Sequence, residues 1–467
     1  MLAQAWLRFL VRVFLGIAFW CYFRRVYVRD AGGVPVAGPL LLVANHPNSL
    51  VDPALLIHLL GRPVYFGARH RLFETSLRPI LKALGAIPLV RVQDEPGAMR
   101  QNLAAIRTYV SLLERGRATA IFPEGVSQDA PRLAPVRNGA ARIALAAEAG
   151  RDFRLDLRIV PVGLQFEPRR RFRGDAFVRF GTPFGIHDLA ALHAARPRDA
   201  LRELTGRIET ALTELAVHVE SVDHAWLVDR LSEVYLQRVR RTGLLGTGRE
   251  GLRGELRYRM AACLNYFSRT DSRIVAQVER SLRRYDRLRE AAGIRSRLVE
   301  EPAYLLPGPL GAPQAAFEIA AGFLPALIGM ATGGAPYVVT RHLARCLASR
   351  NRHPPSLSLL HILIGAVAFP AAYGAQILVA WRLLPWVWVL LFSGLLAPAG
   401  LFALVYLRRV RKLAVHVPGR LASWMRVEEI ARVREAQGEL LDLMDRTRRR
   451  YQEEVFGTGA SDGISSG

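Results

Sequence analysis

The segment "NHPNSLVDP", residues 45–53, follows the apolar run "GPLLLVA" and holds a histidine and a carboxylate six positions apart. His46 comes where a buried strand should end, and the strand ends of open α/β sheets are where ligands bind. A carboxylate that accepts one imidazole N–H fixes the tautomer, so that the second ring nitrogen can take a proton. His46 and Asp52 are therefore candidates for a general base and for the group that orients it.

A structural role for the same carboxylate is also open. Asp52 and Pro53 precede the helical pattern "ALLIHLL", and an Asp N-cap followed by Pro at the first helical position is a favoured helix start. The segment by itself does not choose between a helix cap and a site.

A second polar segment also follows an apolar run. In "IFPEGVSQD", residues 121–129, Gly125 allows a tight turn and Glu124 is available to hold a backbone or the His46 loop by hydrogen bonds. The alternative is a plain β-turn, because Pro-Glu-Gly is good turn chemistry.

Two more segments complete the set. "GAIPLVR" places Arg91 after an apolar run, as an anion clamp requires, or else as a solvated cation. "IVPVGLQFEP" is mostly strand core, with Pro161 and Gly163 available to bend it toward the other segments.

The elements that must position these residues form an alternating pattern over residues 30–188. Short β-like runs are separated by helical patterns, which predicts an α/β layer of buried, largely parallel strands. The expected strands are "PLLLVA", "PVYFGA", "ATAIFP", "LRIVPVGL" and "AFVRFG".

The composition favours an anionic partner. The chain has 467 residues, 64 Lys and Arg, 40 Asp and Glu, and a formal net charge of +24. Nucleic acid, acidic lipid or a phosphorylated substrate would each fit this charge. The three cysteines show neither metal-ligand nor redox spacing, which fits a reducing compartment.

Two uncharged apolar runs favour the membrane over nucleic acid. Residues 356–381 and 383–407 each exceed the roughly 20 residues that span a bilayer as a helix. Arg382 lies between them in a tight turn, and both outer flanks are basic, so the positive-inside rule places the flanks in the cytoplasm. The alternative is a helical hairpin buried in a large soluble domain.

The rest of the chain is divided by composition. Arg8 and Arg12 share a face of the N-terminal helix, which predicts an amphipathic anchor in the membrane interface, with a true span as the alternative. The expected division is an anchor at 1–29, a catalytic domain at 30–188, a basic helical region at 189–300, an interfacial or re-entrant segment with a basic loop at 301–355, a transmembrane hairpin at 356–407, a cytoplasmic helical region at 408–456 and a disordered tail at 457–467.

Taken together and in order, the four segments resemble the blocks of the glycerolipid (glycerol-3-phosphate and 1-acylglycerol-3-phosphate) acyltransferase family. The resemblance covers roughly residues 30–185 and implies an acyltransferase-type mixed sheet flanked by helices. This chain departs from the commonest family pattern in three ways. Five residues instead of four separate His46 from Asp52, Val126 follows Glu-Gly with no arginine directly after it, and Arg137 stands where the family has Lys.

The resemblance also implies a role for each residue of the blocks. His46 is the expected general base for the acceptor hydroxyl, and Asp52 orients it and stabilises its charge. The implied acceptor-binding residues are Arg91 and Arg137 for the phosphate, and Glu124 and Gly125 for the shape of the pocket.

The sequence thus predicts an integral membrane enzyme, with its catalytic domain on the cytoplasmic side of the cytoplasmic membrane. It would move a fatty acyl group from acyl-CoA or acyl carrier protein to glycerol-3-phosphate or its 1-acyl derivative, toward phosphatidic acid. We expect no cofactor, no metal and no nucleic-acid partner. The open alternatives are an acyl thioester or lysolipid hydrolase, a non-catalytic lipid-binding membrane protein, and a membrane-tethered nucleic-acid binder without a recognisable reader motif.

Overall fold

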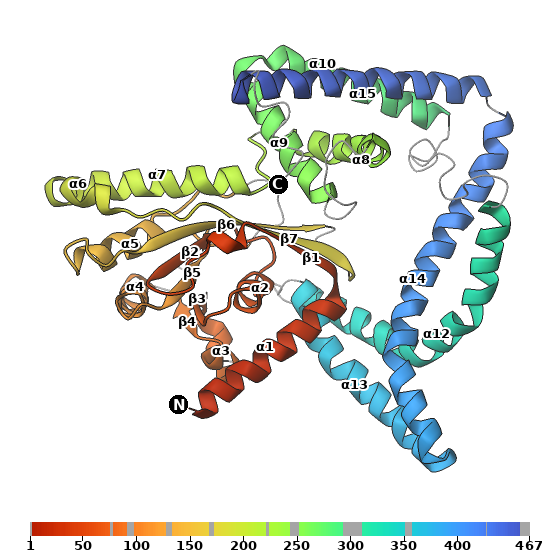
Figure 1. The fold of residues 1–467 in the computed structure, drawn as a ribbon, viewed down its shortest axis with the longest axis horizontal. Helices are drawn as coiled ribbons and strands as arrows, with labels where there is room; N and C mark the ends of the chain where they lie inside the picture. The colour runs from red at the N-terminus through yellow and green to blue at the C-terminus, as the bar shows by residue number, and fades with distance from the viewer. Residues whose placement is uncertain are drawn as a thin grey trace. The chain divides into compact units, whose positions relative to one another are not determined.

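The computed structural model forms two compact units (Figure 1). The first comprises Met1–Ala225, Arg253–Ala262 and Pro355–Leu359, and the second comprises the remaining residues. The structure describes residues 2–74, 78–90, 98–127, 133–167, 172–220, 224–242, 252–292, 311–350, 357–425 and 427–457.

The first unit is built on a seven-stranded sheet with the order β1-β7-β6-β2-β5-β3-β4. All neighbouring strands pair in parallel except β6 and β7, which are antiparallel. This arrangement confirms the expected mixed α/β sheet. The strands are β1 (Phe23–Arg29), β2 (Leu40–Ala44), β3 (Val64–Arg69), β4 (Ala86–Leu89), β5 (Ala118–Ile121), β6 (Arg158–Glu167) and β7 (Gly174–Phe180).

The central strand β2 is buried along its whole length, which explains its unbroken apolar sequence. Leu41 and Val43 of β2 pack in a core cluster with side chains of three helices. These helices are α4 (Ala98–Glu114), α5 (Gly139–Ala149) and α7 (Pro197–Leu215). Figure 1 shows α5 and α7 on one side of the sheet and α1 (Leu2–Tyr22) and α2 (Val51–Leu59) on the other.

Two of the seven strands are absent from the sequence prediction. The expected anchor at 1–29 contains both helix α1 and strand β1, which pairs with β7 at the edge of the sheet. The sequence "FRRVYVR" of β1 directly follows a long apolar helix, so its alternating polar and apolar residues are included in the expected membrane anchor instead of being recognised as a strand. Strand β4 is only four residues long, too short to distinguish from an apolar run before Arg91.

The core of the sheet also extends into the segment 189–300, which the sequence assigns to a separate region. Short helix α6 (Ala190–Ala195) leads into α7, whose buried residues recur every fourth position in the same core cluster as β2. They are Ala200, Leu204, Ile208 and Leu212. A helix outside the expected catalytic boundary therefore completes the packing of the sheet.

The second unit contains a set of charged helices. Arg230 bonds to Asp286 at 2.5 Å, Arg284 bonds to Glu439 at 2.6 Å, and the Tyr235 hydroxyl donates to Asp445. Together these contacts join α8, α10 and α15. The other α-helices in the described residues are α3 (Arg78–Ala83), α8 (Ala225–Thr242), α9 (Leu252–Thr270), α10 (Ser272–Ala291), α12 (Gly311–Arg350), α13 (Leu357–Leu383), α14 (Trp386–Met425) and α15 (Val427–Phe456).

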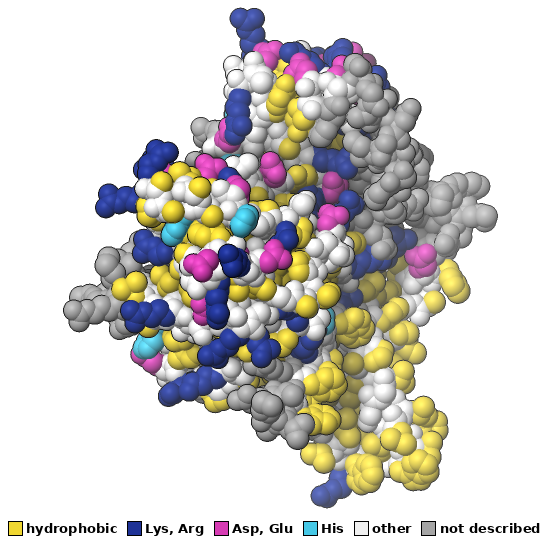
Figure 2. All heavy atoms as spheres, turned by 60° about the vertical axis from the view of Figure 1, so that its left-hand side comes forward, with side chains coloured by type: hydrophobic (Ala, Val, Ile, Leu, Met, Phe, Trp, Pro, Cys, Tyr) yellow, Lys and Arg dark blue, Asp and Glu magenta, His cyan; other side chains and the backbone are white. Residues whose placement is uncertain are grey.

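Three helices of the described chain are long and apolar enough to cross a membrane: Ala316–Ser349, Leu357–Leu383 and Trp386–Arg411. The last two match the helices of the expected hairpin, with the chain turning between Leu383 and Trp386, and their packing as a transmembrane hairpin stays a prediction. Figure 2 shows many hydrophobic side chains on the surface of these apolar helices. These helices indicate a membrane protein.

Helix α12 occupies most of the segment at 301–355 that is expected to be interfacial or re-entrant. The helix runs from Gly311 to Arg350 and continues through Pro325 and Pro336. Whether α12 crosses the membrane stays a prediction. Helix α14 likewise runs unbroken past Leu407 to Met425, beyond the expected end of the hairpin.

Candidate active site

The histidine and the aspartate of the first motif are in direct contact. His46 Nδ1 lies 2.9 Å from Asp52 Oδ2, and the aspartate side chain is fully buried whereas 19% of the histidine side chain is exposed. The same Asp52 oxygen accepts the Asn48 N–H at 2.7 Å. With Nδ1–H donated to the carboxylate, the lone pair of a neutral imidazole lies on Nε2. This is the arrangement that a general base requires.

The expected N-cap role of Asp52 is wrong. Helix α2 begins at Val51 with Leu50 at the N-cap, so Asp52 lies inside the first turn. Its carboxylate turns back to the Asn48 backbone and to His46 instead of capping the helix. A carboxylate in this first turn is also favoured by the helix dipole.

A tight turn accommodates the longer spacing between His46 and Asp52. The Val51 N–H donates to Asn48 O at 3.2 Å, and the Asp52 N–H donates to Ser49 O at 3.1 Å. Ser49 has a φ of +53°, in the left-handed region. The five intervening residues are therefore folded into a turn that returns the carboxylate to the imidazole.

Glu124 joins the second motif to the first. Its Oε1 accepts the His46 N–H at 2.6 Å, and its Oε2 accepts the Ala134 N–H at 2.9 Å. The segment also forms a β-turn, because the Gly125 N–H donates to Phe122 O at 3.1 Å, so both alternatives hold: Glu124 lies in a turn and fixes the His46 loop. Burial raises the pKa of the Glu124 carboxyl, an effect that outweighs the two N–H donors, which lower it.

Two residues that the sequence analysis did not select reinforce this junction. The Ser127 hydroxyl accepts the Ser49 N–H at 2.9 Å. The ring of Phe122 stacks on His46, with centroids 4.3 Å apart and an interplanar angle of 27°. Both residues lie close to Glu124 in the segment 121–129, and this closeness in sequence is the signal that could have identified them as part of the site.

Asn45 joins the His46 loop to β6. Its amide donates to Leu164 O at 2.9 Å, and its Oδ1 accepts the Leu164 N–H at 2.6 Å. The side chain thus continues the hydrogen-bonding of β2 past the end of the strand. Gly163, next to Leu164, permits the carbonyl of Leu215 at the end of α7 to approach closely, where any Cβ would clash.

Arg137 lies over Gly125. Its guanidinium carbon is 3.3 Å from the place where a Cβ on Gly125 would be, and Gly125 has a φ of +67°, so a side chain there is disfavoured twice. The Arg137 N–H donates to Pro123 O at 3.0 Å, while its side chain is exposed. Two of the expected acceptor-binding residues are therefore neighbours. Arg91 lies outside the described residues, and its role stays a prediction.

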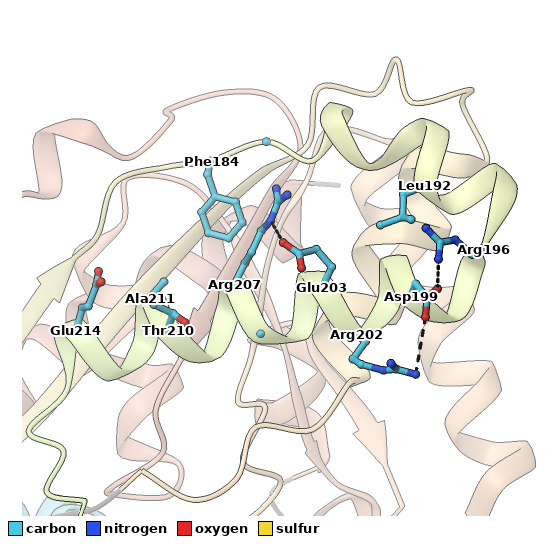
Figure 3. A pocket seen from close by; sticks show the side chains of 12 residues that line it. Phe184, Leu192, Arg196, Asp199, Arg202, Glu203, Arg207, Thr210, Ala211 and Glu214 are labelled. Carbon is cyan, nitrogen blue, oxygen red and sulfur yellow. Dashed lines mark hydrogen bonds and ion pairs between the residues drawn. The ribbon is translucent and has the colours of Figure 1, made fainter. Parts of the chain in front are cut away.

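A hollow of about 1000 Å³ lies along α7, apart from this cluster (Figure 3). Its lining runs from Phe184 to Glu214 and includes none of the described site residues. Arg196 and Arg202 pair with Asp199, and Arg207 pairs with Glu203 at 3.0 Å. Because its charges are matched within the lining, this hollow offers little excess charge for an anionic substrate.

The described cluster thus combines a base, a buried carboxylate that orients it, and a cation. Glu124 and Asn45 fix the position of the loop that carries the base. Such a set can remove a proton from a hydroxyl group next to an anion. The expectation that no metal or cofactor takes part stays a prediction.

Comparison with known proteins agrees with this geometry. The Acyltransferase family model matches residues 25–165. Glycerol-3-phosphate O-acyltransferase 2 of Saccharomyces cerevisiae is 27% identical over 135 residues, which are 29% of this chain and 18% of that protein. The "Probable 1-acyl-sn-glycerol-3-phosphate acyltransferase" of Mycoplasma genitalium is 28% identical over 142 residues, which are 29% of this chain and 51% of that protein.

Among solved structures, the 1-acyl-sn-glycerophosphate acyltransferase PlsC of Thermotoga maritima matches with 18% identity and a TM-score of 0.32, over 44% of this chain and 79% of that one. The chain spans about half or less of the length of the two curated relatives above. The matched region includes every predicted site residue. Residues 25–165 are thus an acyltransferase domain, and over this region the chain is similar to proteins named as glycerol-3-phosphate and 1-acyl-sn-glycerol-3-phosphate acyltransferases.

Proposed function

We propose that this protein is an O-acyltransferase that moves a fatty acyl group from a thioester donor to a hydroxyl of glycerol-3-phosphate or 1-acyl-glycerol-3-phosphate. The observation that carries the proposal is the contact between His46 and buried Asp52, on a loop that Glu124 holds from the second motif. The donor is acyl-CoA or acyl carrier protein, and the product lies on the route to phosphatidic acid.

The proposed reaction needs no covalent enzyme intermediate, because a thioester is already activated. His46 Nε2 takes the proton as the acceptor hydroxyl oxygen attacks the thioester carbonyl, and a C–O bond forms. The tetrahedral intermediate collapses with cleavage of the C–S bond, and the proton on Nε2 passes to the leaving thiolate. Asp52 stabilises the imidazolium that exists between the two transfers.

Arg137 supports an anionic acceptor. Its exposed guanidinium lies beside the loop that holds His46, and an arginine can bind a phosphate through two parallel N–H donors. Binding the phosphate away from the reacting carbon orients the hydroxyl toward the base. Arg91 is proposed as a second ligand of this phosphate.

Helix α1 supports placement of the domain at a membrane surface. Arg12 donates to Leu60 O at 2.7 Å, so this cation is held by the domain. The opposite face of the helix presents large apolar side chains to the solvent: Trp6, Phe9, Leu10, Val13, Ile17 and Trp20. This arrangement favours a helix lying in the interface over a span. We propose the cytoplasmic membrane, with the domain facing the cytoplasm.

The test is acyl transfer by the full chain in liposomes, with labelled palmitoyl-CoA. Glycerol-3-phosphate and 1-acyl-glycerol-3-phosphate are offered separately to the wild type, to His46→Ala and to the control His187→Ala. His187 is an exposed histidine of the same unit. We expect new ester from at least one acceptor, a rate about 10³-fold or more lower in His46→Ala, and a rate within twofold of wild type in the control.

The products separate the alternatives. Lysophosphatidate formed from glycerol-3-phosphate identifies a first-step enzyme, and phosphatidate formed only from the acylated acceptor identifies a second-step enzyme. Free fatty acid without ester would identify a hydrolase. Ester formation that survives His46→Ala would overturn the proposed mechanism.

A further inference from the structure

The loop of residues 133–137 brings Arg137 to Gly125, and three backbone N–H groups anchor it. The Ala134 N–H donates to Glu124 and the Arg137 N–H donates to Pro123 O. The acceptor of the third bond lies far away in the sequence: the Leu133 N–H donates to His218 Nδ1 at 3.1 Å. His218 lies 53 residues beyond the end of the matched acyltransferase region at residue 165.

The end of helix α7 explains how His218 reaches this loop. The carbonyl of Leu215 packs against Gly163, which has no side chain to prevent the approach. Ala216 then adopts an extended conformation with ψ of 156°, and Val219 is buried again. The chain therefore leaves α7 beside the strand to which Asn45 is bonded, and His218 lies between the buried residues Ala216 and Val219 in the sequence.

The direction of the hydrogen bond defines what His218 must provide. A backbone N–H can only donate, so Nδ1 must carry a lone pair and the ring proton must be on Nε2. The Oδ1 atom of an asparagine can occupy nearly the same place and accept the same bond. A leucine has the shape of asparagine but offers no acceptor, which gives a matched pair of substitutions.

We propose that His218 is a positioning residue for Arg137 and so sets the affinity of the site for the phosphate of the acceptor. This inference rests on the proposed function. The Arg137 side chain is exposed, so the place of its guanidinium depends on the loop, which is anchored at Leu133, at Ala134 and at the Arg137 N–H itself. The Ala134 anchor is shared with the His46 loop through Glu124, whereas the His218 anchor serves the Arg137 loop.

The first test is kinetic and uses the full chain in liposomes. His218→Leu should raise the KM for the phosphorylated acceptor by about threefold to tenfold, the effect of one lost hydrogen bond. Its kcat and its KM for palmitoyl-CoA should stay within twofold of wild type. His218→Asn should restore the acceptor KM to within about twofold. In an Arg137→Ala background, the leucine and asparagine variants should be equal, because the cation they position is gone.

A second measurement does not depend on activity. Hydrogen–deuterium exchange of the peptide that contains Leu133 and Ala134 should be faster in His218→Leu than in His218→Asn. Unchanged exchange, equal acceptor KM values for the two variants, or a penalty that persists without Arg137 would each overturn the positioning role. A wild-type chain that forms no ester overturns the proposed function and the phosphate role, while the exchange data still decide whether His218 anchors the loop.

Discussion

The sheet unit and the three apolar helices place apolar side chains in opposite ways. In the sheet unit, all five residues of β2 are fully buried. In α12 and α13 many large apolar side chains are strongly exposed, among them Phe317 at 72% and Val367 at 70%. Between these two helices, the half-buried Gln376 of α13 donates to Thr332 O of α12 at 2.9 Å. This is the difference expected between a region that folds in water and helices that face lipid.

The buried polar groups of the two regions also have different surroundings. Asp52 is a buried charge that receives an imidazole and a backbone N–H, whereas Gln376 is a neutral group bonded to a helix carbonyl. A buried charge next to a titratable group in a site is a common arrangement for catalysis. A neutral hydrogen bond between apolar helices contributes to packing.

The largest effect should come from testing this contrast at Asp52. Asp52→Asn removes the charge that stabilises the imidazolium but keeps the shape, so kcat for ester formation should fall about 10³-fold or more. Gln376→Leu should leave kcat within about twofold of wild type. The measurement is initial-rate kinetics at saturating acceptor, with circular dichroism to show that both variants are folded. Equal losses in the two variants would remove the distinction between catalytic and packing polar groups.

A second prediction compares the same substitution in the two environments. Val367 and Val36 are both strongly exposed valines, one on α13 and one in the sheet unit. Val367→Arg places a charge in the middle of an apolar helix, which costs about 2.5–3.5 kcal/mol in membrane insertion. Val36→Arg should cost less than about 0.5 kcal/mol. Membrane-integrated protein per cell and melting temperature in detergent measure both effects. If Val367→Arg is as harmless as Val36→Arg, the helix does not face lipid.

The predictability of the site follows from where its contacts lie in the sequence. His46, Asp52 and Glu124 carry strong signals, because each follows an apolar strand within a few residues. The contact of His46 with Asp52 is local, so spacing was enough to suggest it. Asn45 was not selected, because its partner Leu164 is 119 residues away and any asparagine at a strand end looks the same.

The fold was less predictable at its edges than at its centre. The buried strands β2, β5 and β6 could be predicted from their mainly apolar sequences, because strands that are covered on both faces of a sheet need apolar residues throughout. Strand β1 was missed because its partner, β7, lies about 150 residues away and the preceding helix dominates the local pattern. Helix α7 falls in the expected basic helical region at 189–300, because most of its residues are polar and only every fourth residue is buried in the core. In both cases, long-range partners and not local propensity determine the structure.

A third prediction tests close packing, which both regions share. Gly163 faces the Leu215 carbonyl in the sheet unit, and Gly329 faces the Ala399 carbonyl between α12 and α14. Neither carbonyl can rotate away as a side chain could, so an added methyl should cost about 1–3 kcal/mol at each place.

Gly163→Ala should lower both thermal stability and acyl transfer, because Gly163 lies in β6, the strand bonded to Asn45. Gly329→Ala should loosen the helix pair and increase its proteolysis, with less effect on transfer. Their matched controls are Gly206→Ala on α7 and Gly334→Ala on α12, where a Cβ meets nothing within 4 Å. A control variant as unstable as its partner would show that helix or strand propensity, and not close approach, explains the loss.

The smallest effect concerns Glu124 and the pH dependence of stability. Burial raises the folded-state pKa of this carboxyl above its ordinary value of 4.5, so folding favours its protonated form. The stabilisation from this proton is fully present below pH 4.5 and is lost as the pH rises through the folded-state pKa. The melting temperature of wild type relative to Glu124→Gln should therefore fall with rising pH through that window, by an amount on the order of 2 °C.

Ser127→Ala removes a neutral acceptor from the same loop, so its difference from wild type should not change with pH in this way. A wild-type advantage that instead grows with pH would mean that the hydrogen bonds from His46 and Ala134 outweigh burial, and the carboxylate would then be stabilised as an ion, as Asp52 is proposed to be.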